Sequence, residues 1–257
     1  MHYSVTGPLD RRPVIAFANS LGTDFRIWNA VADLLAADYT LVRYDKRGHG
    51  LSDTGTVPYT MSDHIGDLAA LLDALSVRRA VICGLSVGGM IAQGLAAQRP
   101  DLVRALVLCD TAQKIGDDAL WNARIEAVTE YGVASISGPV LDRWFSPGFR
   151  AGKPAEWAGY RNMLERTPKE GYAATCQAIR DTDYTVLAAS IPVPALCVVG
   201  EHDGATPPPL VAELAGLIPG ARFEEIAGAG HLPCIEQPEA LAGLIGEFLR
   251  EPERAAP

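Results

Sequence analysis

The sequence has no long apolar run and no excess of positive charge. No stretch reaches the roughly 18 apolar residues that a bilayer-spanning helix needs, and the first residues lack the basic and apolar regions of a signal peptide. The 257 residues carry a net charge of −9, whereas nucleic acids and anionic membranes require a basic face. We therefore expect a cytoplasmic protein that binds neither nucleic acid nor membranes.

The sequence also lacks the spacings that bind metals or pair cysteines. Its five cysteines include no Cys-x-x-Cys pair, and Cys83, Cys109 and Cys197 lie in apolar runs typical of buried strands. The five histidines form no His-Glu-x-x-His or Cys/His pattern. We expect reduced cysteines in the core and no metal site.

Short apolar runs alternate with amphipathic segments along most of the chain. The runs predict strands at 3–5, 13–18, 40–44, 79–83, 104–109, 195–199 and 222–226, and the amphipathic segments predict helices at 27–36, 61–75, 90–98, 209–218 and 238–249. Strands that are apolar throughout are typical of a parallel sheet with helices on both faces. The sequence therefore predicts an α/β fold with a mostly parallel central sheet.

This alternation stops after Asp110. Residues 112–190 contain four helix-like stretches and three tryptophans but no convincing buried strand. The insertion falls on the side of the sheet where strand ends carry ligands. We predict a helical cap, or lid, at 112–190 over an α/β core of 1–111 and 191–257; the alternative is an ordinary set of surface helices.

The segment Gly84-Leu85-Ser86-Val87-Gly88 lies between an apolar strand and a helix-like pattern. A serine at such a turn is forced into a strained, exposed conformation, and the small residues two before and two after it let strand and helix approach closely. The free N–H groups of the following helix would stabilise an oxyanion. Ser86 is the candidate nucleophile; the alternative is a tight turn with an inert serine.

Two later loops supply a base and an acid. Asp203 follows the strand at 195–199, and His231 follows the last strand, so both are expected at the same sheet edge as Ser86. A serine hydroxyl needs a base to take its proton and a third group to orient that base. The chain order Ser, Asp, His is that of α/β-hydrolases.

Each of these assignments has an alternative. Asp203 could cap the next helix, and Asp110, at another strand end, is a rival acid. His202 is a rival base, but it is adjacent to Asp203 on the same loop. Two adjacent residues cannot readily orient each other toward a distant serine. His49 is expected to organise its loop rather than to perform chemistry.

An oxyanion hole requires two donors. The backbone N–H of Val87, the residue after the nucleophile, is one candidate, and the N–H of Leu21, in the loop after the strand at 13–18, is the other. Most esterase relatives carry His-Gly where this chain has Asn19-Ser20. This difference keeps the Leu21 amide available, and it leaves the role of the Asn19 and Ser20 side chains open.

With these motifs the chain resembles the 3-oxoadipate enol-lactonases, α/β-hydrolases of bacterial aromatic-compound degradation. The resemblance extends through the loops of Asp203 and His231, and its other matching segments are 19–23, 43–50, 83–89, 143–147 (Arg-Trp-Phe-Ser-Pro) and 170–176. It implies hydrolysis of 3-oxoadipate enol-lactone through an acyl-enzyme on Ser86, with no cofactor.

The small anionic lactone substrate implied by the resemblance calls for a local cation in an otherwise acidic protein. We nominate Arg143, with Trp144 packing against the lactone ring; Arg124, Arg161 and Arg180 are competitors. Alternatively, Arg143 pairs with a surface acid and Trp144 fills the cap core. Functional alternatives are a broad carboxylesterase, a carbon–carbon bond hydrolase and a slow-turnover receptor for a small ligand.

Overall fold

A seven-stranded sheet forms the centre of the computed structural model, which describes residues 1–250. The strand order is β1-β3-β2-β4-β5-β6-β7, and only the edge strand β1 runs antiparallel to its neighbour. The strands are β1 (Tyr3–Thr6), β2 (Val14–Ala18), β3 (Thr40–Tyr44), β4 (Ala80–Leu85), β5 (Val103–Cys109), β6 (Ala195–Gly200) and β7 (Arg222–Ile226). The predicted mostly parallel α/β sheet is confirmed.

The sheet has its topological switch point between β2 and β4. Along the chain, β2 is followed by β3 on one side, and β4 then pairs with β2 on the other side. At such a point the connections leave in opposite directions and open a crevice at the carboxyl ends of the strands. The loop after β2 and the turn after β4 both emerge there.

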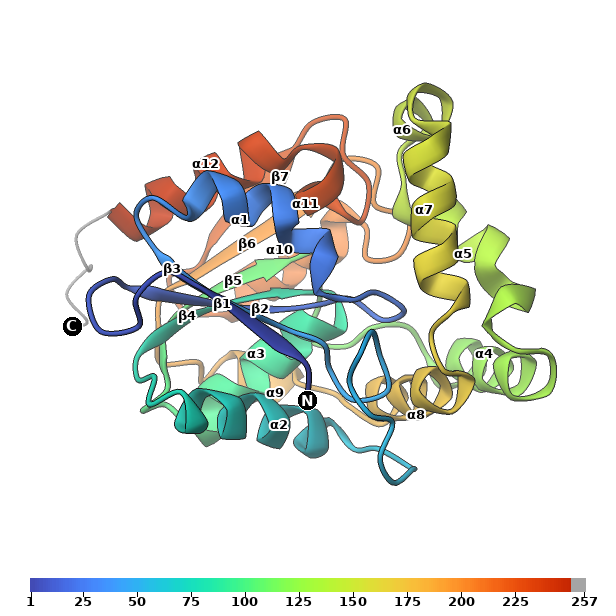
Figure 1. Ribbon diagram of the computed structural model, residues 1–257, viewed down its shortest axis with the longest axis horizontal. Helices are drawn as coiled ribbons and strands as arrows, with labels where there is room; N and C mark the ends of the chain where they lie inside the picture. Colours follow the sequence, from blue (N-terminus) through green and yellow to red (C-terminus); the bar gives the residue numbers. More distant parts are fainter. Residues whose placement is uncertain (251–257) are drawn as a thin grey trace.

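Helices cover both faces of the sheet (Figure 1). Helices α1 (Asn29–Leu35) and α12 (Pro238–Arg250) pack together on one face, beside the short α11 (Pro233–Glu236). Helices α2 (Met61–Ala74), α3 (Val87–Gln98) and α10 (Pro208–Leu217) lie on the other face, with α9 (Thr185–Ala188) between α3 and α10. This arrangement explains why the central strands are apolar on both sides.

Two of the predicted helices differ most from the structure, and the other predicted boundaries lie within two residues of the observed ones. The helix expected at 90–98 begins at Val87, immediately after Ser86. Its first turn contains Gly88 and Gly89, which are poor helix formers and hide the helix start from sequence analysis. The helix expected at 27–36 is a 3₁₀ turn (Phe25–Trp28) followed by α1.

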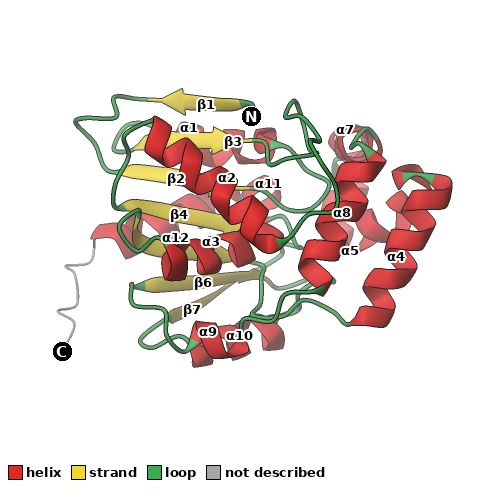
Figure 2. Cartoon of the chain, turned by 90° about the horizontal axis from the view of Figure 1, so that it is seen from below, coloured by secondary structure: helices red, strands yellow, loops and turns green. Residues whose placement is uncertain are grey.

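Residues 112–190 contain helices and turns but no strand. Where four helix-like stretches were expected, the structure has α4 (Asp118–Tyr131), a 3₁₀ turn (Val133–Ile136), α5 (Ser137–Trp144), α6 (Pro147–Gly152), α7 (Pro154–Glu165) and α8 (Lys169–Arg180), followed by α9. Figure 2 shows α4, α5, α7 and α8 beyond the carboxyl ends of the parallel strands. We call α4–α8 the helical layer.

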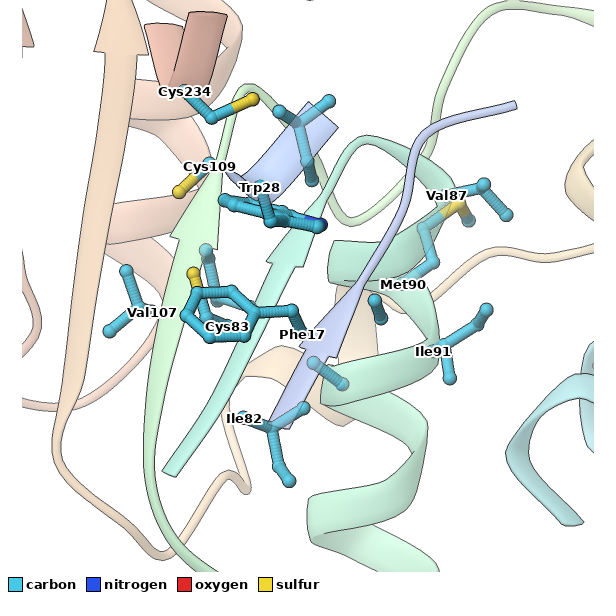
Figure 3. Packing of buried hydrophobic residues seen from close by; sticks show 14 of the residues in the cluster. Phe17, Trp28, Ile82, Cys83, Val87, Met90, Ile91, Val107, Cys109 and Cys234 are labelled. Atoms are coloured by element: carbon cyan, nitrogen blue, oxygen red, sulfur yellow. The ribbon is translucent and has the colours of Figure 1, made fainter. Parts of the chain in front are cut away.

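The core lies around β2, β4 and β5. All five cysteines are buried and unpaired, as predicted for those in the strands. Figure 3 shows the thiol groups of Cys83, Cys109 and Cys234 among apolar side chains near Phe17 and Trp28, whose ring centroids are 4.9 Å apart. Within residues 1–250, none of the helices has the length and apolar character to cross a bilayer.

Candidate active site

Ser86 occupies a strained turn between β4 and α3. Its backbone has φ +59° and ψ −120°, a region that side-chain-bearing residues rarely adopt. A Cβ on Gly84 would lie 2.2 Å from the carbonyl oxygen of Gly88, and one on Gly88 would lie 2.1 Å from the carbonyl oxygen of Ala18. The two glycines therefore permit the close strand–helix crossing that exposes Ser86 to the cavity above the sheet edge.

His231 and Asp203 form a buried pair at the same edge. His231 Nδ1 lies 2.9 Å from Asp203 Oδ2, and the two residues are 1% and 4% exposed. Asp203 Oδ1 accepts from the N–H groups of Ala205 and Thr206, and Oδ2 accepts from the Thr206 hydroxyl. Burial opposes ionisation of Asp203, but His231 and these donors hold the pKa of its carboxyl below the ordinary value.

The rival acid and rival base have other environments. Asp110 is fully buried, and its Oδ1 accepts from the Gly200 N–H at 2.9 Å. Burial and the charge of Asp203 raise the pKa of Asp110 well above its ordinary value. His202 is exposed beside Glu201. The geometry joins His231, rather than His202, to an ionised carboxylate.

Three groups here have a metal-compatible spacing, with ligand atoms of Asp110, Asp203 and His231 within 4.8 Å of one another. A metal would have to replace the hydrogen bond between His231 and Asp203. The carboxylate is also already satisfied by the donors of Thr206 and Ala205. In this cluster the hydrogen-bonded pair of His231 and Asp203 therefore lies beside a carboxyl group, that of Asp110, whose ionisation is opposed by burial.

The loop after β2 lies at the same cavity as Ser86. Ser20 and Leu21 line the same cavity as Ser86, and the hydrogen bonds of the turn they form leave the Leu21 N–H without an acceptor among the described residues. Asn19 anchors the loop: its Nδ2 donates to the Tyr44 carbonyl, and its Oδ1 accepts from Trp28 Nε1. Val87, at the amino end of α3, points its side chain into the core.

A cavity of about 120 Å³ connects Ser86 and His231 with the helical layer. Trp144 and two half-buried arginines, Arg124 and Arg143, line it together with Trp121 and Tyr172. Arg124 stacks on Trp121, and burial together with the charge of Arg124 lowers the pKa of Arg143. Within residues 1–250 no carboxylate forms a salt bridge with either guanidinium.

The other two candidate arginines are engaged elsewhere. Arg161 lies near Glu165 and stacks on Trp157, and Arg180 pairs with Asp181 and donates to Asn122. Neither lines the cavity that contains Ser86.

Sequence analysis missed two supporting residues, Thr206 and Glu236. Thr206 was recognisable as the third residue after an aspartate, a spacing typical of side-chain-capped turns. Glu236 accepts from the N–H of Gly230, beside His231, and from the N–H and hydroxyl of Ser146 in the helical layer. No local pattern reveals that contact, because Ser146 lies 90 positions away.

Comparisons with known proteins identify the family of this chain. The family model described as the alpha/beta hydrolase fold matches residues 13–238. The chain belongs to the α/β-hydrolase fold family. This hydrolase is 34% identical to 3-oxoadipate enol-lactonase 2 of Acinetobacter baylyi over 240 residues, which cover 93% of this chain and 89% of the relative.

Solved structures of α/β-hydrolases superpose closely. The enol-lactonase from Burkholderia xenovorans LB400 has a TM-score of 0.94 and 38% identity, covering 97% of this chain and 96% of that one. A thermophilic esterase from Thermogutta terrifontis, with malate bound, has a TM-score of 0.92 and 29% identity, with 97% and 93% coverage.

Proposed function

We propose that this hydrolase opens an anionic enol-lactone, 3-oxoadipate enol-lactone, in the degradation of aromatic compounds. The observation that carries the proposal is the cavity in which two arginines without carboxylate partners, Arg124 and Arg143, share a wall with Ser86 and His231. The similarity to proteins named 3-oxoadipate enol-lactonase and enol-lactonase supports it.

The reaction starts at Ser86. His231 donates its Nδ1–H to Asp203, which leaves Nε2 as the base that takes the Ser86 proton. The serine oxygen attacks the lactone carbonyl, and the oxyanion is stabilised by the N–H groups of Leu21 and Val87. The ring C–O bond then breaks, and His231 returns the proton to the leaving enol oxygen.

The leaving enol remains part of the acyl group on Ser86, because the ester is cyclic. It tautomerises to a ketone, and water activated by His231 then hydrolyses the acyl-enzyme. The product leaves as one open-chain dicarboxylate, and Ser86 and His231 regain their original protonation states.

The substrate carboxylate is proposed to bind at Arg143 and Arg124. A guanidinium pairs with a carboxylate through two parallel hydrogen bonds, and partial burial strengthens this attraction by reducing solvent screening. Trp144, which is 4% exposed and lines the cavity, supplies a flat apolar wall for the lactone ring.

A broad carboxylesterase is the second candidate function, supported by the similarity to a solved esterase. The same nucleophile, base and oxyanion hole would act on any accessible ester. The two functions differ in the role of the arginines, because a neutral ester gains nothing from a guanidinium.

The deciding experiment follows loss of 3-oxoadipate enol-lactone absorbance beside hydrolysis of p-nitrophenyl acetate, with Ser86→Ala as the control. Rapid, serine-dependent opening of the lactone with a much higher kcat/KM than for the acetate is the expected result. Faster cleavage of the acetate would assign a general esterase. Very slow turnover of both substrates would favour a ligand receptor, and normal turnover by Ser86→Ala would refute the mechanism.

A further inference from the structure

Lys46 is a buried lysine directly behind the candidate oxyanion hole. It follows β3 at the carboxyl edge of the sheet and is 1% exposed, and its Nζ donates to the carbonyl oxygen of Ser20 at 2.5 Å. Removing an ammonium group from water is costly unless its charge is used or paired. A methionine of similar length would fill the same space without that cost, so packing alone does not account for a lysine here.

The Ser20 carbonyl and the Leu21 N–H are the two ends of one peptide group. In a trans peptide they point in opposite directions. A donor behind the loop can therefore bind the Ser20 carbonyl oxygen while the Leu21 N–H points away from that donor. Besides Lys46, the Thr23 hydroxyl donates to this oxygen at 2.9 Å and the Thr23 N–H at 3.3 Å. Three donors fix the plane of the peptide, and one of them carries a full positive charge.

We propose that Lys46 is a positioning residue for ester hydrolysis that orients and polarises the Ser20–Leu21 peptide group. By drawing electron density toward the carbonyl oxygen, the ammonium makes the Leu21 N–H a stronger donor to the oxyanion. The inference rests on the proposed function, because it takes Ser86 as the nucleophile and the Leu21 amide as an oxyanion donor.

The surroundings of Lys46 keep its charge sensitive to the reaction. Burial lowers the pKa of Lys46 to about 7, against the attraction of Asp45 and Asp24. The buried imidazoles of His49 and His64 also lie near it. Burial lowers the pKa of both histidines, and the charge of Lys46 lowers it further. An oxyanion at the far end of the Ser20–Leu21 peptide adds negative charge and favours the ammonium form. Polarisation is therefore greatest in the transition state and falls as rising pH removes the proton.

The test compares Lys46→Met with Thr23→Val. Both variants remove one donor to the same carbonyl oxygen, but only the first removes a charge. An oxyanion-hole donor contributes about 10²- to 10³-fold in rate, and neighbouring hydrogen bonds strengthen one another by about 10–30%. We therefore expect Lys46→Met to lower kcat for p-nitrophenyl acetate by about two- to eightfold with little change in KM, and Thr23→Val to lower it less.

Phenylboronic acid, which forms a tetrahedral adduct with an active-site serine, provides the second readout. Its inhibition constant should rise for Lys46→Met by about the factor lost from kcat, while the melting temperature stays equal or increases. The descending limb of the kcat–pH profile above neutrality should disappear in this variant.

Unchanged kcat and unchanged boronic acid affinity in Lys46→Met would overturn the inference. So would a lower melting temperature with parallel losses in kcat and substrate binding, because that pattern is the one expected of a purely structural lysine. The acetate assay does not depend on which ester is the natural substrate. If Ser86→Ala retains activity, the proposed function itself fails, whereas an inactive Ser86→Ala beside a fully active Lys46→Met refutes only the role of Lys46.

Discussion

Replacing Arg143 with methionine removes a guanidinium from the cavity wall while keeping most of its apolar stem. A carboxylate that loses a charged hydrogen-bond partner forfeits about 1.5–3 kcal/mol, equivalent to about 10- to 150-fold in affinity. The single variant should fall near the lower limit for two reasons. Arg124 still lines the cavity, and removing Arg143 relieves the repulsion between the two guanidinium groups that lowers the Arg143 pKa. We expect KM for 3-oxoadipate enol-lactone to rise about tenfold, with kcat nearly unchanged.

The assay separates charge recognition from general damage by using a neutral substrate. α-Angelica lactone has the same enol-lactone ring with a methyl group in place of the carboxymethyl group, so its kinetics should be nearly insensitive to Arg143→Met. Arg161→Met is the matched control, because this arginine belongs to the same helical layer but stacks on Trp157 outside the cavity. Equal losses on both lactones, or no loss on either, would refute carboxylate binding by Arg143.

Three further predictions follow from the site. Gly88→Ala places a methyl group 2.1 Å from a backbone oxygen and should lower the urea-derived free energy of unfolding by about 3 kcal/mol or more. Gly66 in α2 has open space around it, so Gly66→Ala should raise this free energy by about 1 kcal/mol. Similar values for the two variants would contradict the packing account. Asp203→Asn should lower kcat about 10⁴-fold, whereas Asp110→Asn, which replaces a carboxyl group whose ionisation is opposed by burial, should change it only a few-fold. Steady-state kinetics showing equal losses would overturn the choice of acid. Burial raises the Glu236 pKa despite its hydrogen bonds, so folding disfavours the ionised form of this side chain. The stability advantage of the parent over Glu236→Gln should therefore shrink as the pH rises from about 4.3 upward. An advantage that grows with pH in urea titrations would show the opposite pKa shift.

The placement of Ser86, Asp203 and His231 at one edge of the sheet could be predicted from sequence because its signals are local. Gly84 and Gly88 are required because β4 and α3 cross closely beside Ser86. Their positions two residues before and two residues after Ser86 make this requirement visible in the sequence. Asp203 and His231 each follow a strand that sequence analysis placed correctly, so parallel pairing alone brings them to one edge. Polarity and periodicity were sufficient for these residues.

The burial of Lys46, and the choice among the four candidate arginines, could not be predicted, because both depend on residues that are distant in sequence. Lys46 lies within a charged loop motif whose composition suggests an exposed turn, and its burial depends on Ser20, 26 positions earlier. Arg124 and Arg143 come from different helices, and only the packing of α4 and α5 against the sheet edge decides that both line the cavity while Arg161 does not. No periodicity within one helix contains that information.

Several energetically unfavourable features of this fold lie at the carboxyl edge of the sheet. Ser86 and Asp110 have positive φ angles of +59° and +47°, Asp110 is a fully buried acid, and Lys46 is a buried base. Conformations and burials of this kind persist only when the surrounding packing and hydrogen bonds outweigh their cost. Here the strands beneath are apolar and closely packed, so they can supply that stability. The rigid sheet therefore holds Ser86, the His231–Asp203 pair and the loop of Leu21 in a costly geometry before any substrate arrives, and this preorganisation is what the proposed ester hydrolysis requires.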